Sequence, residues 1–258
     1  CENYILEFFS GKNDDIKIKN VEAIKKGHAA GVDLTSIKIN IERSDYVRTQ
    51  LLLSGADTVA LGAIAGGCNY VCGYPMSPST SVLEKMASYS KKFDVIVEQV
   101  EDEVGVVNMA IGAWYAGARA LVTTSGGGFA LMCEGISLCG MIESPLVLHL
   151  AQRPGPATGL PTRTEQGDLD LVLYAGHGDF PRIILAPGTL EEGFTLTQKA
   201  FNLSDKYQVP VFILTDQFYV DSVYNTPVFN VTDFKVERYI IKTEKNYKRF
   251  LFTENGIS

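Results

Sequence analysis

The sequence is poor in cationic side chains and has no long apolar run. Its 23 lysines and arginines stand against 30 aspartates and glutamates, which gives a formal net charge of −7 at pH 7. Proteins that bind a phosphate backbone need a positive surface, which this balance does not supply. No apolar run approaches the roughly 20 residues that a membrane-spanning helix requires. We therefore expect neither nucleic acid nor a membrane as a partner, and we predict a soluble, cytoplasmic protein.

Cysteine and histidine are also scarce, and their spacing argues against a metal site in this chain. The five cysteines include no Cys-x-x-Cys pair, so they are interpreted as reduced thiols. None of His28, His149 and His177 has a partner at the spacing of a zinc site or a catalytic triad, which favours core or surface roles. Iron–sulfur clusters need several closely spaced cysteines, so we expect any electron-transfer centre that works with this protein on another chain.

Three common functional motifs are missing as well. The sequence has no Walker-type Gly-Lys-Ser/Thr and no Gly-x-Ser-x-Gly. The run Gly126-Gly127-Gly128 does not fit the dinucleotide fingerprint G-x-G-x-x-G, because position 131 is leucine. Glycines at this place still let the backbone approach a ligand or another loop closely. The absences argue against a P-loop NTPase, a serine hydrolase and a dinucleotide-dependent dehydrogenase.

From residue 54 onward, short apolar runs alternate with helical segments. The runs are continuous rather than alternating, which is typical of strands that are buried on both faces. Predicted strands are Asn69–Gly73, Val95–Glu98, Arg119–Ser125, Leu146–Leu150, Arg182–Ala186 and Val209–Thr215. Predicted helices are Ala56–Ala65, Ser81–Lys91, Glu103–Ala116, Glu134–Ile142, Leu169–Tyr174 and Leu190–Lys206. This order predicts an α/β fold, a parallel sheet with helices on both faces, whose ligands bind beyond the carboxyl ends of the strands.

Both ends of the chain depart from this rhythm. Two short helices, Tyr4–Phe9 and Val21–Ala30, are expected before a polar connector from Asp33 to Arg48. Past Asp221 the sequence is typical of a short-stranded, aromatic-bearing connector. We therefore expect three parts: residues 1–50, the α/β domain over 51–221, and a connector over 222–258, with both ends cut from a longer protein.

The loop from Tyr74 to Thr80 is the most informative segment. Its two prolines fix their own backbone and push the residues before them, Tyr74 and Ser77, into extended conformations. A stiff loop that holds the Ser77 hydroxyl outward at a strand end presents a polar group to a ligand. Strand-to-helix loops of this kind also occur for purely architectural reasons, and the segment alone does not separate the two.

Acidic residues concentrate at the start of the third predicted helix of the α/β domain. Carboxylates in a first turn stabilise a helix by roughly 0.3 to 1 kcal/mol each, so capping is one explanation for Glu101, Asp102 and Glu103. Capping does not readily account for three in a row. If Glu103 shares the inner helix face with Val107 and Ile111, it is a partly buried carboxylate suited to general acid chemistry.

Two polar loops follow the strand that ends at Leu150. Arg153 lies at a strand end, where a fixed guanidinium can clamp a carboxylate through two parallel hydrogen bonds; the alternative is a structural salt bridge. The stretch Pro161–Gln166 is either a second polar loop of the site or a capped helix start at Thr164.

Five segments together resemble the alpha subunit of the 2-oxoacid:ferredoxin oxidoreductases. They occur in the order of that family and extend over roughly residues 51–221. The segments are Tyr74–Thr80, Glu101–Glu103, Thr123–Phe129, Gln152–Gly159 and Thr215–Gln217. Residues 1–50 are similar to the tail of the gamma domain that fused members carry, and residues 247–258 to the family's connector to a further domain.

The resemblance implies the pyrimidine-binding half of a thiamine diphosphate site. Glu103 matches the glutamate that hydrogen-bonds the pyrimidine ring nitrogen, with Glu101 as the alternative. Ser77 matches a threonine near the substrate keto group, and Met76 stands where isoleucine is usual. Arg153 matches the arginine that faces the substrate carboxylate. The further cofactor-binding residues implied are Tyr74, Pro75, Thr124, Ser125 and Gly126.

The implied reaction converts a 2-oxoacid, coenzyme A and oxidised ferredoxin to acyl-CoA, carbon dioxide and reduced ferredoxin. The family's Gly-Asp-Gly motif for Mg²⁺ and diphosphate is absent, because Gly167-Asp168-Leu169 lacks the second glycine. Mg²⁺, the diphosphate grip and the iron–sulfur cluster are therefore expected on a beta subunit. Two alternatives stay open: half of a non-oxidative thiamine diphosphate decarboxylase or transketolase-like enzyme, and a scaffolding protein without chemistry.

Overall fold

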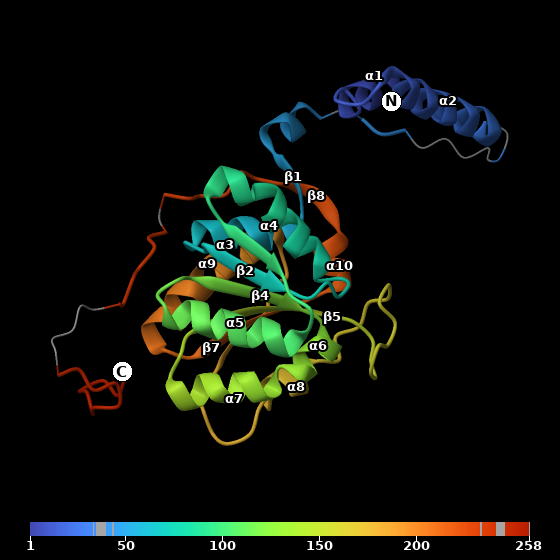
Figure 1. The fold of residues 1–258 in the computed structure, drawn as a ribbon. Coiled ribbons are helices and arrows are strands. Elements are labelled where there is room, and N and C mark those ends of the chain that lie inside the picture. Colours follow the sequence, from blue (N-terminus) through green and yellow to red (C-terminus); the bar gives the residue numbers. More distant parts are fainter. Residues whose placement is uncertain (33, 35–39, 43, 233, 241–245, 258) are drawn as a thin grey trace. The chain divides into compact units, whose positions relative to one another are not determined.

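The computed structural model describes residues 1–32, 34, 40–42, 44–232, 234–240 and 246–257 (Figure 1). The predicted polar connector from Asp33 to Arg48 lies partly outside the described residues. The chain divides into two compact units, residues 1–45 and 46–258. None of the helices in the described part of the chain has the length and apolar character that a bilayer crossing needs.

The first unit is a pair of helices, α1 (Glu2–Phe8) and α2 (Asp14–Gly31). Both helices were expected, but α2 begins seven residues earlier than the sequence predicts. The Asn13 side chain accepts a hydrogen bond from the Ile16 N–H, at 3.0 Å, and Asp14 and Asp15 lie in the first turn. This N-cap and the favourable charges explain the earlier start.

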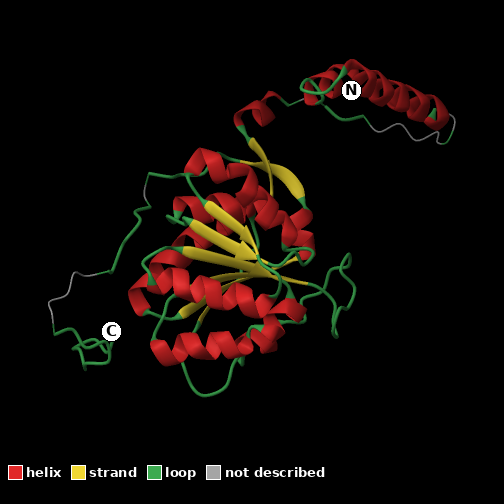
Figure 2. Ribbon diagram, in the orientation of Figure 1, coloured by secondary structure: helices red, strands yellow, loops and turns green. Residues whose placement is uncertain are grey.

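A six-stranded parallel sheet forms the centre of the second unit, as predicted (Figure 2). Its order is β3-β2-β4-β5-β7-β6, so β3 and β6 form the two edges, and the strands between them lie in the middle of the sheet. The strands are β2 (Tyr70–Gly73), β3 (Ile96–Gln99), β4 (Ala120–Thr124), β5 (Leu146–Gln152), β6 (Ile183–Leu185) and β7 (Pro210–Asp216). All residues of β4, β5 and β7 are buried, which explains their continuous apolar runs.

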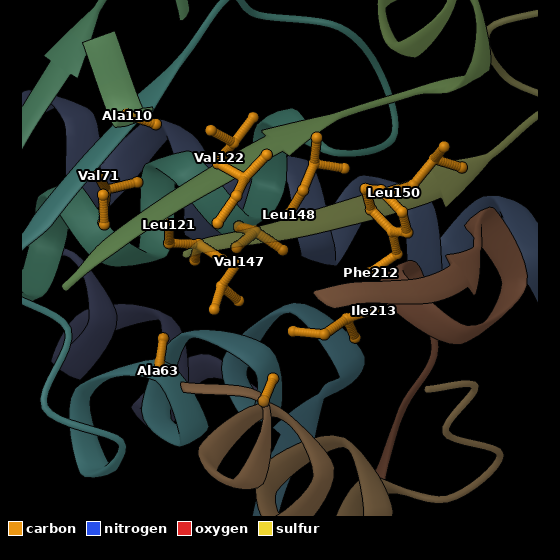
Figure 3. Close-up of a cluster of buried hydrophobic side chains, with 14 of the residues drawn as sticks. Ala63, Val71, Ala110, Leu121, Val122, Val147, Leu148, Leu150, Phe212 and Ile213 are labelled. Carbon is orange, nitrogen blue, oxygen red and sulfur yellow. The ribbon is translucent and has the colours of Figure 1, made fainter. Parts of the chain in front are cut away.

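Helices cover both faces of this sheet, as expected. On one face α3 (Gly55–Ala65) packs between α4 (Thr80–Phe93) and α9 (Leu190–Tyr207). On the other face lie α5 (Glu103–Tyr115), α6 (Gly126–Leu131) and α7 (Cys133–Ile142), with α8 (Leu169–Leu173) near them (Figure 1). The core consists of strand side chains between these layers, among them Leu121, Val147, Leu148 and Ile213 (Figure 3).

Several elements were not predicted. The glycine run forms the short helix α6, and Gln217–Asp221 forms α10. Strands β1 (Leu51–Ser54) and β8 (Val223–Thr226) pair antiparallel in a separate two-stranded sheet, and Asp45–Thr49 is a 3-10 turn. Strands β1 and β8 lie more than 160 residues apart in the sequence, so no local sequence pattern predicts their pairing.

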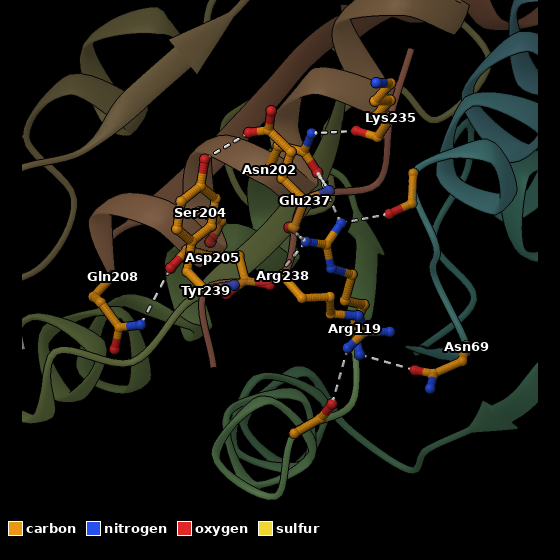
Figure 4. Close-up of polar contacts among 12 residues, drawn as sticks. Asn69, Arg119, Asn202, Ser204, Asp205, Gln208, Lys235, Glu237, Arg238 and Tyr239 are labelled. Carbon is orange, nitrogen blue, oxygen red and sulfur yellow. Dashed lines mark hydrogen bonds and ion pairs between the residues drawn. The ribbon is translucent and has the colours of Figure 1, made fainter. Parts of the chain in front are cut away.

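A buried arginine lies where β4 begins. Arg119 is fully buried and pairs with Asp205 of α9, with 2.8 Å between Nη2 and Oδ2 (Figure 4). The same guanidinium donates to the Gly66 carbonyl at 2.7 Å and to the Glu237 carbonyl. It therefore ties the sheet, α9 and the segment around residue 237 together.

Candidate functional site

The candidate site lies at the carboxyl edge of the sheet. Because β2, β3, β4, β5 and β7 are parallel, the loops that follow them emerge at the same edge. These loops carry the residues that the sequence singled out, around Tyr74, Glu98, Thr124, Gln152 and Asp216.

Glu103 begins α5 and points into the protein. Asp102 caps the helix by accepting a hydrogen bond from the Gly105 N–H at 2.6 Å, which leaves Glu103 as the first helical residue. Its side chain is only 4% exposed, and Oε1 is buried without a hydrogen-bond partner among the described residues. The predicted burial of Glu103 is confirmed. A buried carboxylate oxygen without a partner costs free energy, so this atom is a strong candidate for contact with a ligand.

The glycine run packs closely against this carboxylate. A Cβ atom at Gly128 would lie 2.3 Å from Thr124 Oγ1 and 2.6 Å from Glu103 Oε1, so only glycine fits there. Ser125 is fully buried, and its Oγ also has no partner in the described part of the chain. Glu103 of α5 and Thr124 of β4 therefore meet at Gly128 of α6, the helix that follows Ser125.

Arg153 connects the two loops that flank the site. Its Nη1 donates to the Ser77 carbonyl at 2.6 Å, and its Nη2 donates to the Thr158 carbonyl at 2.9 Å. The residue is 7% exposed. Burial lowers the pKa of the guanidinium, and the negative charges of Asp168 and Glu103 oppose that shift. Both of these bonds go to backbone carbonyls rather than to a carboxylate.

The remaining predicted residues lie in the same loops. Ser77 is exposed, with its carbonyl held by Arg153. Tyr74 and Pro75 open the loop after β2, and the Tyr74 side chain is exposed. Gly126 is buried at the start of α6. The stiffness of the loop between β2 and α4 stays a prediction.

Sequence reasoning missed Asp168. A Cβ at Gly126 would lie 2.4 Å from Asp168 Oδ1, and Asp168 Oδ2 is buried without a partner among the described residues. Burial raises the pKa of this carboxyl group, while the Arg153 backbone N–H, which donates to it, acts in the opposite direction. The sequence offered two signals, the Gly167-Asp168-Leu169 segment, which was set aside because it lacks a second glycine, and the polar loop Pro161–Gln166 just before it, which was left open between a site loop and a helix start.

The stretch Pro161–Gln166 forms a loop rather than a helix start. Thr164 Oγ1 accepts a hydrogen bond from the Phe218 N–H at 3.4 Å, and Gln166 Nε2 donates to Asp216 Oδ2 at 2.6 Å. The loop thereby docks on the end of β7 and the start of α10. Among the residues that the structure describes, no three His, Cys, Asp or Glu side chains gather closely enough to hold a metal ion.

Comparison with known proteins gives one consistent result. The sequence profile of the family described as pyruvate flavodoxin/ferredoxin oxidoreductase, thiamine diP-binding, matches residues 61–254. A protein of Sulfurisphaera tokodaii named 2-oxoacid:ferredoxin oxidoreductase 1, subunit alpha, is 37% identical over 99% of this chain and 43% of its own length. The 2-oxoglutarate synthase subunit KorA of Archaeoglobus fulgidus is 36% identical over 80% of this chain and 61% of its own length.

A solved structure agrees with these relatives. The 2-oxoglutarate:ferredoxin oxidoreductase from Magnetococcus marinus, solved with 2-oxoglutarate, coenzyme A and succinyl-CoA bound, superposes with a TM-score of 0.85 at 34% identity. The match covers the whole of this chain and 45% of that one. The chain thus spans about half the length of the proteins it matches.

Proposed function

Because this chain belongs to the pyruvate flavodoxin/ferredoxin oxidoreductase family, through its thiamine diphosphate-binding domain, we propose that it is the alpha-subunit part of a 2-oxoacid:ferredoxin oxidoreductase. The reaction is the oxidative decarboxylation of a 2-oxoacid with coenzyme A, which yields an acyl-CoA, carbon dioxide and reduced ferredoxin. The names of the relatives, which are 2-oxoacid and 2-oxoglutarate enzymes, support this reaction class.

The observation that carries the proposal is the unpartnered Oε1 of Glu103. It lies beside Gly128, where a Cβ atom would come within 2.6 Å of it, and a ring nitrogen of the bound coenzyme would supply its missing hydrogen bond. Bound thiamine diphosphate supplies a carbon nucleophile that also accepts the electron pair released by decarboxylation. Glu103 would share a proton with the pyrimidine ring nitrogen and orient the ring. Tyr74, Pro75, Thr124, Ser125 and Gly126 would line the remainder of the pyrimidine site.

Arg153 and Ser77 would act on the substrate. The guanidinium has five N–H donors, and two of its nitrogens already hold the loops on either side through backbone carbonyls. The remaining donors suit a 2-oxoacid carboxylate, and the exposed Ser77 hydroxyl suits the neighbouring keto oxygen. Arg153 would then fix the substrate and the loop that contacts it at the same time.

Partner subunits would complete the enzyme. Since the Gly-Asp-Gly motif is absent from this sequence, Mg²⁺, the diphosphate grip and the iron–sulfur cluster are assigned to a beta subunit, and ferredoxin would accept the electrons. Glu103 and Arg153 would then face a site shared between the two chains.

A turnover assay of the full-length alpha chain co-expressed with its partner subunit tests the proposal. We expect ferredoxin reduction that requires both coenzyme A and a 2-oxoacid. A panel of pyruvate, 2-oxoglutarate and branched-chain acids then identifies the substrate. Release of carbon dioxide without coenzyme A or electron transfer would contradict the proposal and favour the non-oxidative decarboxylase. A complex that binds no thiamine diphosphate would favour a scaffolding role.

A further inference from the structure

The centre of the sheet contains a histidine that the proposed chemistry does not use. His149 of β5 is 0% exposed. Its Nδ1 lies 2.9 Å from Thr123 Oγ1 of β4, and its Nε2 lies 2.8 Å from Thr215 Oγ1 of β7. Thr123 Oγ1 in turn lies 3.3 Å from the Ser79 carbonyl oxygen. These four groups form a continuous line of hydrogen bonds, here called the threonine–histidine relay.

The relay has one consistent direction. Burial lowers the pKa of His149 to about 3, so the ring is neutral and has one donor and one acceptor. Thr123 has a single hydroxyl hydrogen, and the Ser79 carbonyl can only accept it. Thr123 Oγ1 therefore accepts from the His149 Nδ1–H, and Nε2 accepts from the Thr215 hydroxyl. In the opposite tautomer, with the hydrogen on Nε2, the Thr123 hydroxyl would donate to Nδ1, and its oxygen would face the Ser79 carbonyl oxygen without a hydrogen between them. The hydroxyl hydrogen of Thr215 would then have no acceptor in the described part of the chain.

The relay ends on the loop that carries Ser77. Ser79 is buried, and its own hydroxyl donates to the Met76 carbonyl at 2.6 Å. Arg153 holds the Ser77 carbonyl from the other side, at 2.6 Å. The backbone around Ser77 is thus fixed from the site by Arg153 and from the core by Thr123.

A histidine is an unusual choice for this position if packing alone matters. Its neighbours in β5, from Leu146 to Leu150, are otherwise apolar, and an apolar side chain would fill the same space without needing two hydroxyl partners. A fully hydrogen-bonded polar network, in contrast, selects one geometry of the groups it joins.

We propose that Thr123, oriented by His149, is a positioning residue whose hydroxyl fixes the backbone beside Ser77 and thereby determines how the site binds its 2-oxoacid. This inference rests on the proposed function, because Ser77 is assigned there to the substrate. His149 itself is fully buried in the sheet and is assigned no contact with the substrate.

The decisive experiment separates the Thr123 hydroxyl from the volume of its side chain. Thr123→Val removes the hydrogen bonds to the Ser79 carbonyl and to His149, and Thr123→Ser keeps both. Thr197→Val makes the same change at a fully buried threonine of α9 whose hydroxyl has no partner among the described residues. In the assembled enzyme, we expect Thr123→Val to raise the KM for the 2-oxoacid about tenfold, the effect of one hydrogen bond, with an unchanged KM for coenzyme A. Thr123→Ser and Thr197→Val should behave like the unaltered enzyme.

A second measurement does not depend on activity. Hydrogen exchange of the peptide over residues 74–83 should be faster in Thr123→Val than in Thr197→Val, because the loop loses its attachment to the core. If the unaltered complex turns over no 2-oxoacid, the proposed function fails, and the exchange rates still test the relay. Equal exchange of this peptide in Thr123→Val and Thr197→Val would overturn the inference. So would an active Thr123→Val complex whose loop exchanges faster but whose KM for the 2-oxoacid is unchanged. Equal changes in the KM values for the 2-oxoacid and for coenzyme A would also overturn it.

Discussion

Glu101 and Glu103 are two residues apart, and only Glu103 faces the interior. We expect Glu103→Gln to lower turnover of the assembled enzyme by about 10² to 10⁴, because the amide cannot share a proton with the coenzyme ring. Glu101→Gln changes an exposed carboxylate in the same chain segment and should leave turnover almost unchanged. Steady-state assays at saturating substrates measure both effects. The reverse order of losses would transfer the role to Glu101.

Arg153 allows a second prediction for a single residue. We expect Arg153→Lys to raise the KM for the 2-oxoacid far more than that for coenzyme A, because one ammonium cannot hold the Ser77 and Thr158 carbonyls and a carboxylate together. Arg163→Lys, an exposed position in the neighbouring loop, is the matched control. Equal KM increases for the two substrates would instead assign Arg153 a purely structural role.

The sequence alone predicted the place of some site residues and not of others. Glu103, Ser77 and Arg153 lie in short motifs at strand ends, so their convergence at one edge followed from the parallel order. Asp168 and His149 depend on partners that lie 15 to 66 residues away, at Arg153 and at Thr123 and Thr215. Their contacts exist only after the strands have paired, and no spacing in the sequence reveals them.

Helix α6 shows the same limit for a whole element. The six main strands follow from apolar runs, whereas α6 begins with three glycines, which are poor helix formers. Its helical form depends on close packing against Glu103, Thr124 and Asp168, which only glycine permits at positions 126 and 128. Packing against the rest of the protein therefore makes α6 helical, although its glycines do not favour a helix.

The packing of α6 gives a prediction with an internal control. We expect Gly128→Ala to weaken binding of thiamine diphosphate and to lower the unfolding free energy by about 1 to 3 kcal/mol, because its Cβ overlaps Glu103 and Thr124. Gly112→Ala in α5 adds the same atom where nothing lies within 4 Å, and it should be neutral or stabilising by about 0.4 to 1 kcal/mol. Coenzyme titration and thermal melting of the assembled enzyme measure both. Unchanged coenzyme affinity in Gly128→Ala would contradict the assignment of the site.

At the scale of the whole α/β unit, Arg119 connects segments that lie far apart in the sequence, from Gly66 to Glu237. We expect Asp205→Leu to lower the unfolding free energy by about 3 to 5 kcal/mol, because it leaves a fully buried guanidinium without its counter-ion. Replacing both partners, as Arg119→Met with Asp205→Leu, should cost less than Asp205→Leu alone, since no charge then remains buried. Melting temperatures of the assembled enzyme compare the two. A double variant less stable than the single one would show that Arg119 acts mainly through its backbone partners.

The antiparallel pairing of Leu51 with Thr226 has a consequence for how such a unit can be rearranged in evolution. Adjacent strands lie about 5 Å apart, so the points at which the backbone enters and leaves the βα body share one corner. The βα body can therefore be joined to other protein modules as one intact unit. Another module can be fused at this corner, the gene can be divided there, or the chain can be permuted through it. Each of these changes preserves every parallel strand pair, and with it the arrangement of site residues at the carboxyl edge of the sheet.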